Sequence, residues 1–283
     1  VVIPSEIDGK KVVGIADKAF TDGGVTPTNI SNTKKASASY LNSNENKYVV
    51  TPLMTDVTGL GITSVVIPST IKSIGQSAFK NNKLTEVTIP SSVTSIGDWA
   101  FAGNQLTKIV IPNSVKTIDR GVFASNKLIS LTISNGVESI NEDAFADNKL
   151  TEVTIPSSVT SIMNEAFMSN QLTSITLSDG VTSIGNRAFE GNQLIEVVIP
   201  SSVTSIGRDA FSIGCGTVNC TNNNVCTCIK AGGNENLSKI INKTGRSFDW
   251  DAIINDTNEE RYTFETGSVS SDNKANWNVE ITK

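Results

Sequence analysis

The stretch LTEVTIPSSVTSIGDWAFAGNQ, residues 84–105, decides the fold because close copies of it precede and follow it along the chain. A fixed period of this length indicates a repeat architecture, in which each unit stacks on its neighbours and shares a continuous core with them. Seven consecutive units fit the pattern from residue 62 to about residue 215. Their phenylalanines return every 22 residues, at Phe79, Phe101, Phe123, Phe145, Phe167, Phe189 and Phe211.

Within one unit, the order of residue types predicts short strands joined by tight turns. Leu84, Val87 and Ile89 alternate with polar residues and include β-branched types, which is typical of a strand. Pro90 ends this strand, V-T-S-I supplies a second extended piece, and D-W-A-F is long enough only for a tight turn or a single helical turn. The sequence therefore predicts a mainly β, right-handed solenoid of about eight coils.

One asparagine per unit, three residues after the phenylalanine, is expected to point inward. Its amide would satisfy backbone groups of neighbouring turns, because buried polar groups must be hydrogen-bonded. We expect the phenylalanine rings to stack from coil to coil beside this column. The asparagines are Asn82, Asn104, Asn126, Asn148, Asn170 and Asn192.

The chain outside these seven units predicts three further segments. Residues 1–20 match part of one unit, with the extra residues E-I-D-G-K in a longer turn, and they are followed by an insertion at 21–61. Because the first residues match the middle of a unit, we expect a fragment, or a mature form whose upstream segment has been removed. The seven repeats then occupy 62–215, and a C-terminal cap or module occupies 216–283.

The pattern L-T-x-V-T-I-P-x-S-V-T-S-I-G-x-x-A-F-x-x-N, nearly unchanged at 84–104, 150–170 and 194–211, resembles the BspA-like leucine-rich repeats of bacterial and protist surface proteins. The resemblance covers about two thirds of the chain. It implies a cell-surface or secreted scaffold, often linked to adhesion, and it carries over no catalytic residue. The departures are Ser134 and Ser178 at the proline position, Asp119, Asn141 and Met163 at the glycine position, and a missing asparagine in the last unit; none removes a core residue.

Composition argues against several classes of function. The net charge of −5 gives no basic stripe for nucleic acid, and no run of 18 apolar residues exists to span a membrane. The chain contains no histidine, which excludes histidine-dependent nucleophiles and histidine-ligated metals. We therefore expect no cofactor, no nucleic-acid partner and no enzymatic activity.

The insertion at 21–61 begins polar and rich in Gly, Ser and Asn, and it ends in the more apolar YVVTPLMTDV. One interpretation is a long loop whose second half re-enters the stack. The other is a binding loop that projects from one edge, as long loops often do. Tyr40, Tyr48 and Met54 would then be its anchors.

The C-terminal region contains all four cysteines, Cys215, Cys220, Cys226 and Cys228. Their spacing lacks the paired C-x2-C knuckles of a zinc site, so we expect two disulfides, with Cys215 and Cys220 each bonded to one of the other two. LSKIINKTGRSFDWDAIIN predicts a short helix or a helix–strand piece, and YTFETGSV and NWNVEITK predict strands. The region would cap the open solenoid end, or serve as a recognition module using Trp250, Tyr262, Phe264 and Trp277.

Outward strand positions supply the remaining candidates. Glu86 and Lys108 lie on adjacent coils and are expected to pair across them. Glu152 and Glu196 lie two coils, roughly 10 Å, apart, which is beyond a retaining glycosidase pair and at the edge of the inverting range. The sequence signals no cleft and no aromatic sugar platform beside them, so we expect no catalysis. Trp99 occupies a position that is polar in most units; it would either cover a neighbouring turn or act as a binding hot spot.

Taken together, these observations predict a non-enzymatic scaffold, on the cell surface or secreted, that binds a host, matrix or neighbouring-cell protein or glycan. The alternative is a structural subunit, or a displayed domain, of an extracellular filament or surface layer, in which copies of the chain contact one another. An upstream apolar stretch would favour the filament, as in pilins, and a plain secretion signal would favour the soluble adhesin.

Overall fold

The computed structural model describes residues 1–7, 10–22, 37–40, 47–51, 58–212, 215–220, 226–230, 239–243, 263–264 and 277–282, and the side chains of 1–6, 11–20, 60–212, 240 and 243. These residues form strands and turns and contain no helix. The chain divides into two compact units, Val1–Asn148 (unit 1) and Lys149–Lys283 (unit 2). Each is a β-solenoid of stacked coils, so the predicted mainly β repeat fold is confirmed.

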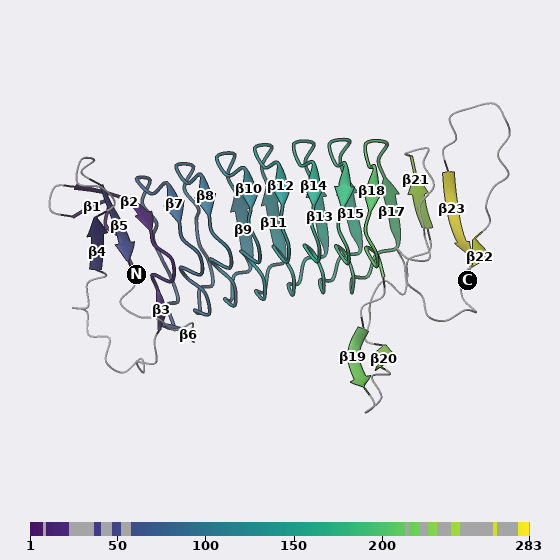
Figure 1. Cartoon of the computed structure of the whole chain (residues 1–283), viewed down its shortest axis with the longest axis horizontal. Coiled ribbons are helices and arrows are strands. Elements are labelled where there is room, and N and C mark those ends of the chain that lie inside the picture. Colours follow the sequence, from purple (N-terminus) through teal and green to yellow (C-terminus); the bar gives the residue numbers. More distant parts are fainter. Residues whose placement is uncertain are drawn as a thin grey trace. The chain divides into compact units, whose positions relative to one another are not determined.

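In unit 1, short strands stack in parallel along the coils (Figure 1). Strand β2 has three partners: β1 lies antiparallel to it, whereas β5 and β7 lie parallel to it, and β7 continues to β8. Strand β5 thus brings part of the insertion into the stack, with β4 at the edge. The strands are β1 (Glu6–Ile7), β2 (Lys10–Ile15), β3 (Thr21–Asp22), β4 (Ser37–Tyr40), β5 (Lys47–Thr51), β6 (Thr58–Gly59), β7 (Ser73–Ile74), β8 (Ser95–Ile96), β9 (Lys108–Ile111), β10 (Thr117–Ile118), β11 (Ser130–Ile133) and β12 (Ser139–Ile140).

Unit 2 repeats the pattern and then ends it with antiparallel strands. Strands β13 and β15 pair, as do β14, β16 and β18 in turn, and β21 adds one more parallel strand to β17. Strand β23 then lies antiparallel to both β21 and β22. The strands are β13 (Glu152–Ile155), β14 (Ser161–Ile162), β15 (Ser174–Leu177), β16 (Ser183–Ile184), β17 (Glu196–Ile199), β18 (Ser205–Ile206), β19 (Cys215–Cys220), β20 (Cys226–Lys230), β21 (Lys239–Asn242), β22 (Thr263–Phe264) and β23 (Trp277–Thr282).

A stack of phenylalanine rings forms the centre of each core. In unit 1, consecutive rings from Phe20 to Phe145 lie 4.8–5.7 Å apart and within 10° of parallel. In unit 2, Phe167, Phe189 and Phe211 stack at 5.4 and 5.6 Å. Offset stacking at this spacing is favourable beyond the burial of apolar area, so the 22-residue period sets both the spacing of the coils and their main contact.

The asparagine column forms hydrogen bonds with backbone groups of the turns beside these rings. Asn104, for example, accepts a hydrogen bond at Oδ1 from the N–H of Leu84 (3.0 Å). Its Nδ2 donates to the carbonyl of Phe101 in the same turn (3.0 Å) and to that of Phe79 in the preceding coil (2.8 Å). Asn82, Asn126, Asn148, Asn170 and Asn192 are buried in the same way.

The turn that leads into each phenylalanine is hydrogen-bonded. The residue two positions before the phenylalanine has left-handed backbone in all seven repeats, with φ of 54–59°. Its N–H donates to the next coil: Trp99 to the Arg120 carbonyl (2.8 Å), and Arg187 to that of Arg208 (2.9 Å). The side of each unit formed by these turns and the asparagine column is called the turn column below.

Candidate functional site

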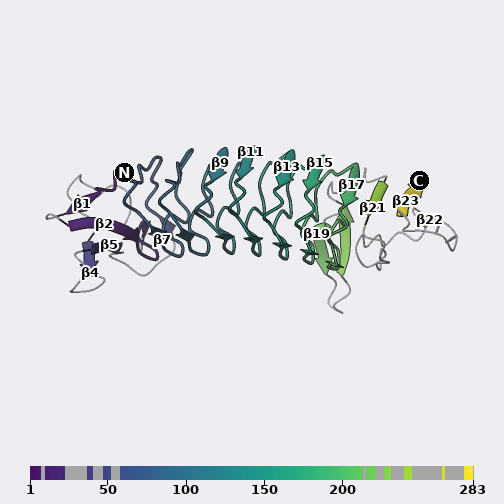
Figure 2. The same cartoon turned by 90° about the horizontal axis from the view of Figure 1, so that it is seen from above.

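Strands β9 and β11 in unit 1, and β13, β15 and β17 in unit 2, lie on one side of their unit (Figure 2). This side, with the equivalent residues 62–67 and 84–89 of unit 1, is called the strand face below. Along β9 and β13, residues are alternately exposed and buried, so the polar side chains face outward. The outward positions also carry large apolar side chains: Val66, Val110 and Ile129 in unit 1 and Ile195 in unit 2 are 46–61% exposed. The strand face therefore combines hydroxyl, charged and apolar groups on an extended β-surface.

In three coils, the residue that follows the four-residue strand is not proline, and it donates a backbone hydrogen bond to the preceding coil. Where it is Ser134, Ser178 or Lys243, its N–H donates to the last carbonyl of the preceding strand, at 3.3, 3.3 and 2.9 Å. The strands before these three residues are β11, β15 and β21, which pair with β9, β13 and β17. Proline has no N–H to donate at this position.

Among the coils in which proline follows the strand, three form no ladder with the preceding coil on the strand face, whereas Val66, in the coil before Pro68, bridges to Val2. In unit 1, residues 84–89, before Pro90, are not part of a ladder, and β9, before Pro112, pairs only with β11. In unit 2, β17, before Pro200, belongs to a different sheet from β15. On the strand face, the strands therefore pair two by two and do not form one continuous sheet within either unit.

The residue two positions after the proline position also differs between the coils that pair with the preceding coil and those that do not. A Cβ at Gly136 or Gly180, in the S-x-G coils, would collide with a backbone carbonyl oxygen of the preceding coil. In the P-x-S coils a serine stands there. Two of these hydroxyls bridge to the preceding coil, Ser92 Oγ to the Ile71 carbonyl (2.7 Å) and Ser202 Oγ to that of Val181 (2.6 Å), whereas Ser114 and Ser158 Oγ are buried without a hydrogen-bond partner. Glycine thus permits close approach where the backbone pairs.

A groove of about 620 Å³ lies where the strand face of unit 1 is open. Its walls are residues 85–89 on one side and residues 107–110 with Pro112 on the other. Glu86 and Lys108 line opposite walls, but no ion pair joins these two described side chains, so the expected cross-coil pair does not form.

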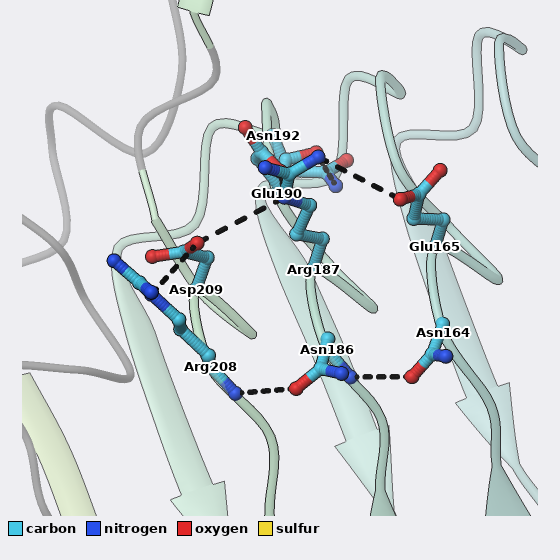
Figure 3. Close-up of polar contacts among 8 residues, drawn as sticks. All are labelled: Asn164, Glu165, Asn186, Arg187, Glu190, Asn192, Arg208 and Asp209. Carbon is cyan, nitrogen blue, oxygen red and sulfur yellow. Dashed lines mark hydrogen bonds and ion pairs between the residues drawn. The ribbon is translucent and has the colours of Figure 1, made fainter.

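In unit 2, the turn column carries a cluster of charges (Figure 3). The Arg187 guanidinium lies 3.7 Å from Glu165, 3.4 Å from Glu190 and 3.8 Å from Asp209. Arg208 approaches Asp209 to 3.7 Å. Partly exposed pairs such as these stabilise a fold by about 0–1 kcal/mol each, and the carboxylates already neutralise the guanidinium, so the cluster functions as a brace between coils.

Beside this cluster, side-chain amides form a second ladder between coils. The N–H of Asn186 donates to Asn164 Oδ1 (2.9 Å), and the N–H of Arg208 donates to Asn186 Oδ1 (2.8 Å), as Figure 3 shows. In unit 1 the N–H of Gln76 donates in the same way to Asp17 Oδ1 (2.8 Å). Polar side chains at this position therefore join neighbouring turns.

Trp99 is half-buried in the turn column of unit 1. Its ring lies directly against the backbone of Gly121 in the next coil, where a Cβ would collide with it. Lys80 Nζ and Arg120 Cζ lie 5.0 and 5.7 Å from the ring centre, within cation–π distance. This is the first of the two expected placements, a ring covering a neighbouring turn; a role in binding stays a prediction.

Asp119 stands at the position that is glycine in several coils. Burial, together with the charge of Asp98, raises the pKa of Asp119 above its ordinary value. Asn141, at the same position one coil later, donates to Asp119 Oδ1 at 3.4 Å. The turn column thus contains a carboxyl group whose ionisation opposes folding.

The other predicted site residues are placed as follows. Glu152 and Glu196 are exposed on β13 and β17. Tyr40 and Tyr48 are backbone partners on β4 and β5, and Trp277 begins β23 opposite Asn242. Phe264 ends β22. Met54, Trp250 and Tyr262 lie outside the described residues, as do the side chains of both tyrosines, Phe264 and Trp277.

The cysteines lie on a hairpin of β19 and β20, in which Cys220 is the backbone partner of Cys226, and Val218 that of Cys228. Their side chains lie outside the described residues, so the two disulfides stay a prediction. The segment for which a helix or a helix–strand piece was expected contributes strand β21, and strands β22 and β23 lie in the two segments predicted to be extended.

The sequence analysis missed that the residue after a strand can pair that strand with the preceding coil. The repeat sequences contain a signal for it. Where proline follows the strand, Ser or Thr stands two residues later, as at 90–92 and 112–114. Where proline is absent, glycine follows instead, at 134–136, 178–180 and 243–245. The sequence analysis also missed the charge cluster around Arg187, because its members come from three different coils and only the structure brings them together.

A family model for the BspA-type leucine-rich repeat region matches residues 58–171 and 160–245, with six copies. Because these ranges cover more than half of the chain, it belongs to the BspA-type leucine-rich repeat proteins. A search of curated proteins finds no match.

Several solved structures are similar. A leucine-rich repeat protein from Bacteroides ovatus is 19% identical over 84% of this chain and 64% of its own, with a TM-score of 0.47. A leucine-rich cell surface protein from Faecalibacterium prausnitzii is 24% identical over 75% and 66% (TM-score 0.41), and the pneumococcal vaccine antigen PcpA is 18% identical over 75% and 72% (TM-score 0.35). The chain spans less than two thirds of the B. ovatus protein, and the family assignment rests on the sequence match.

Within the part of the chain that the structure describes, no helix is long and apolar enough to cross a bilayer.

Proposed function

We propose that this chain is a non-enzymatic, cell-surface or secreted scaffold of a bacterium that binds a protein or glycan of a host, a matrix or a neighbouring cell through its strand face. One observation carries the proposal: Val66, Val110 and Ile129, all 46% exposed or more, lie at outward strand positions of unit 1 among threonines and serines. The proposal takes these side chains as parts of one apolar patch, because contiguous exposed apolar patches mark interaction sites.

The chemistry of the described side chains supports binding rather than turnover. The carboxylates of the turn column in Figure 3 are paired with arginines, and Glu152 and Glu196 are exposed on separate strands. The family match supports a scaffold role, because repeat solenoids present extended surfaces for binding. The placement on the cell surface rests on the resemblance of the repeat to surface proteins, and the absence of histidine fits it.

The test is solid-phase binding of the purified chain to collagen, fibronectin, laminin and a glycan array. Val66→Thr with Ile129→Thr installs residues that other coils carry at the same positions, and we expect it to weaken any saturable binding about tenfold. Met163→Asn is the matched control, because Met163 is 41% exposed outside the strand face and Asn141 occupies the equivalent position.

An equal loss in both variants, or no binding to any member of the panel, would contradict the proposal. Hydrolysis of a glycan that disappears in Glu152→Ala with Glu196→Ala would show that the chain is an enzyme. Regular filaments of the chain in electron micrographs would instead favour the structural subunit.

A further inference from the structure

We infer that the strand face of unit 1 binds the same face of a second copy of this chain, as a homophilic contact between neighbouring cells. The inference rests on the proposed function, because it names the partner that the strand face binds. It goes beyond that function in fixing the symmetry of the contact and the residues that meet across it.

The strand face of unit 1 carries one charge of each sign. The outward residues of its four coils, from 62 to 132, are serine, threonine, valine or isoleucine apart from Glu86 and Lys108. Both charged side chains are exposed, and neither forms an ion pair or a side-chain hydrogen bond with another described residue. They stand on adjacent coils, so the face presents a carboxylate and an ammonium group side by side, each available to a partner.

Two-fold symmetry can bring these opposite charges together. Two copies related by such an axis use the same patch on both sides, and packed sheets keep their strands nearly aligned. If the axis runs parallel to the strands, between the coils of Glu86 and Lys108, the order of the coils is reversed in the second copy. Glu86 then faces Lys108 of the second copy, and Lys108 faces Glu86 of the second copy. An axis along the stack of coils would instead set each charge against its own counterpart, and like charges repel.

The same arrangement gives each exposed apolar side chain of the face a threonine as its neighbour. Val66, Val110 and Ile129 are 46–61% exposed in the single chain. Threonine methyl groups can cover them, so the contact removes apolar area from water. The pairs across the axis are Val66 with Thr132, Val110 with Thr88 and Ile129 with Thr63.

The residues at the edges of the face do not oppose this contact. Gly61, Lys83, Gln105 and Lys127 precede the first apolar residue of the four coils. Reversal of the coils sets Lys83 opposite Gln105 and Lys127 opposite Gly61, so no two lysines meet. On the other edge, the residue after each strand is proline or serine and adds no charge. The face is therefore self-complementary in charge over all four coils.

The contact is small, which fits binding between many displayed copies rather than a stable dimer. Four strands about 4.8 Å apart and about 17 Å long outline a footprint of roughly 300 Å² per copy. A standard complex buries about 800 Å² of accessible surface per partner, so single copies should dissociate rapidly. Many copies on two surfaces would hold together through avidity. Because a two-fold contact closes after two copies, it does not generate a filament.

The experiment displays the full chain on red and on green beads and counts the clusters that contain both colours. Beads that carry the unmodified chain should form mixed clusters. Lys108→Glu sets carboxylates against carboxylates at both charge contacts, and Glu86→Lys sets ammonium groups against each other. Beads coated with either variant alone should therefore cluster at least about tenfold less.

A mixture of the two variants should restore the contact. Each carboxylate of the Lys108→Glu chain then faces an ammonium group of the Glu86→Lys chain. Red beads of one variant and green beads of the other should therefore cluster as well as unmodified beads do. Misfolding of either variant would not give this recovery, and equal melting temperatures of the three chains would confirm that the fold is kept.

A second pair of variants controls for net charge. Lys116 and Glu138 lie beside β10 and β12, outside the strand face, where they form an exposed ion pair of 3.1 Å. Lys116→Glu and Glu138→Lys change the net charge by the same amounts as the two strand-face variants. Beads coated with either control should still cluster with themselves as unmodified beads do.

The inference is overturned if unmodified beads do not cluster, if either strand-face variant clusters with itself like the unmodified chain, or if the mixture of these two variants does not recover clustering. Equal losses in the control variants would also overturn it, because clustering would then follow net charge. Any of these outcomes, with the panel binding still sensitive to Val66 and Ile129, would leave the proposed function standing with a different partner.

Discussion

The turn column and the strand face are built from the same 22-residue pattern, yet they differ in regularity. On the turn column, ring spacing stays between 4.8 and 5.7 Å in unit 1, and every asparagine of the column is buried. On the strand face, pairing depends on whether proline or another residue follows the strand. The difference shows that one side of the repeat maintains the stack and leaves the other side free to vary.

The largest effect is expected where the turn column is broken at its centre. Phe123 is fully buried between Phe101 (5.6 Å) and Phe145 (5.7 Å). Phe123→Ala should lower the free energy of unfolding by about 3–5 kcal/mol, because it removes both ring contacts and leaves a cavity. Urea denaturation measures this loss. Thr132→Ala, an exposed change on the strand face, should stay within about 0.5 kcal/mol.

A slightly smaller loss should follow from removing one asparagine of the column. Asn126 accepts from the Leu106 N–H and donates to the carbonyls of Phe101 and Phe123. Asn126→Ala leaves these buried groups unpaired and should cost about 2–4 kcal/mol in urea denaturation. The exposed Asn135→Ala is the control, and equal effects of the two changes would refute the structural role of the column.

On the strand face, disrupting the pairing of β11 with β9 should lower the free energy of unfolding moderately. Ser134→Pro with Gly136→Ser removes the Ser134 N–H and adds a Cβ where the Asn113 carbonyl lies. We expect a loss of about 1–2 kcal/mol and faster amide exchange in β11, measured by hydrogen exchange. Ser134→Ala keeps the N–H and should leave exchange in β11 unchanged; if it does not, the backbone donor is not the cause.

The smallest effect concerns Asp119. Its raised pKa means that the folded state binds its proton more tightly than the unfolded state does, so stability falls as pH rises from about 3.9 through the folded-state pKa. Asp119→Asn should therefore raise the melting temperature at pH 7, and the gain should vanish below pH of about 3.9. A gain that persists in acid would contradict the assigned cause.

The fold was largely predictable because its determinants are periodic. The phenylalanine spacing and the alternation at Leu84, Val87 and Ile89 specify the stacked coils and the inward side of each strand. The position of β21 was less predictable, because the segment around Ile240 lacks the following phenylalanine and asparagine. Only the backbone pairing with β17 reveals it as a further strand of the stack.

The candidate site was predictable only in part. Alternation places Glu86 and Lys108 outward, but a pattern of side chains does not show whether two strands pair. Pro112 lacks the N–H that Ser134 and Ser178 donate to the preceding coil, and the sequence does not show how closely the coils approach. Similarly, Trp99 is an aromatic residue at a polar position in the sequence, and only the contact with Gly121 shows what its ring covers.

The most direct measurement is residue-resolved amide hydrogen exchange of the unmodified chain, comparing Glu86–Ile89 with Leu131–Ser134. The residue after each strand should set the exchange rate of the strand face. The amides of Leu131–Ser134 should then be protected, and those of Glu86–Ile89 should exchange at close to the rate of unstructured backbone. Equal protection of the two segments would show that the strand face is continuous, and it would contradict its closure in pairs of strands.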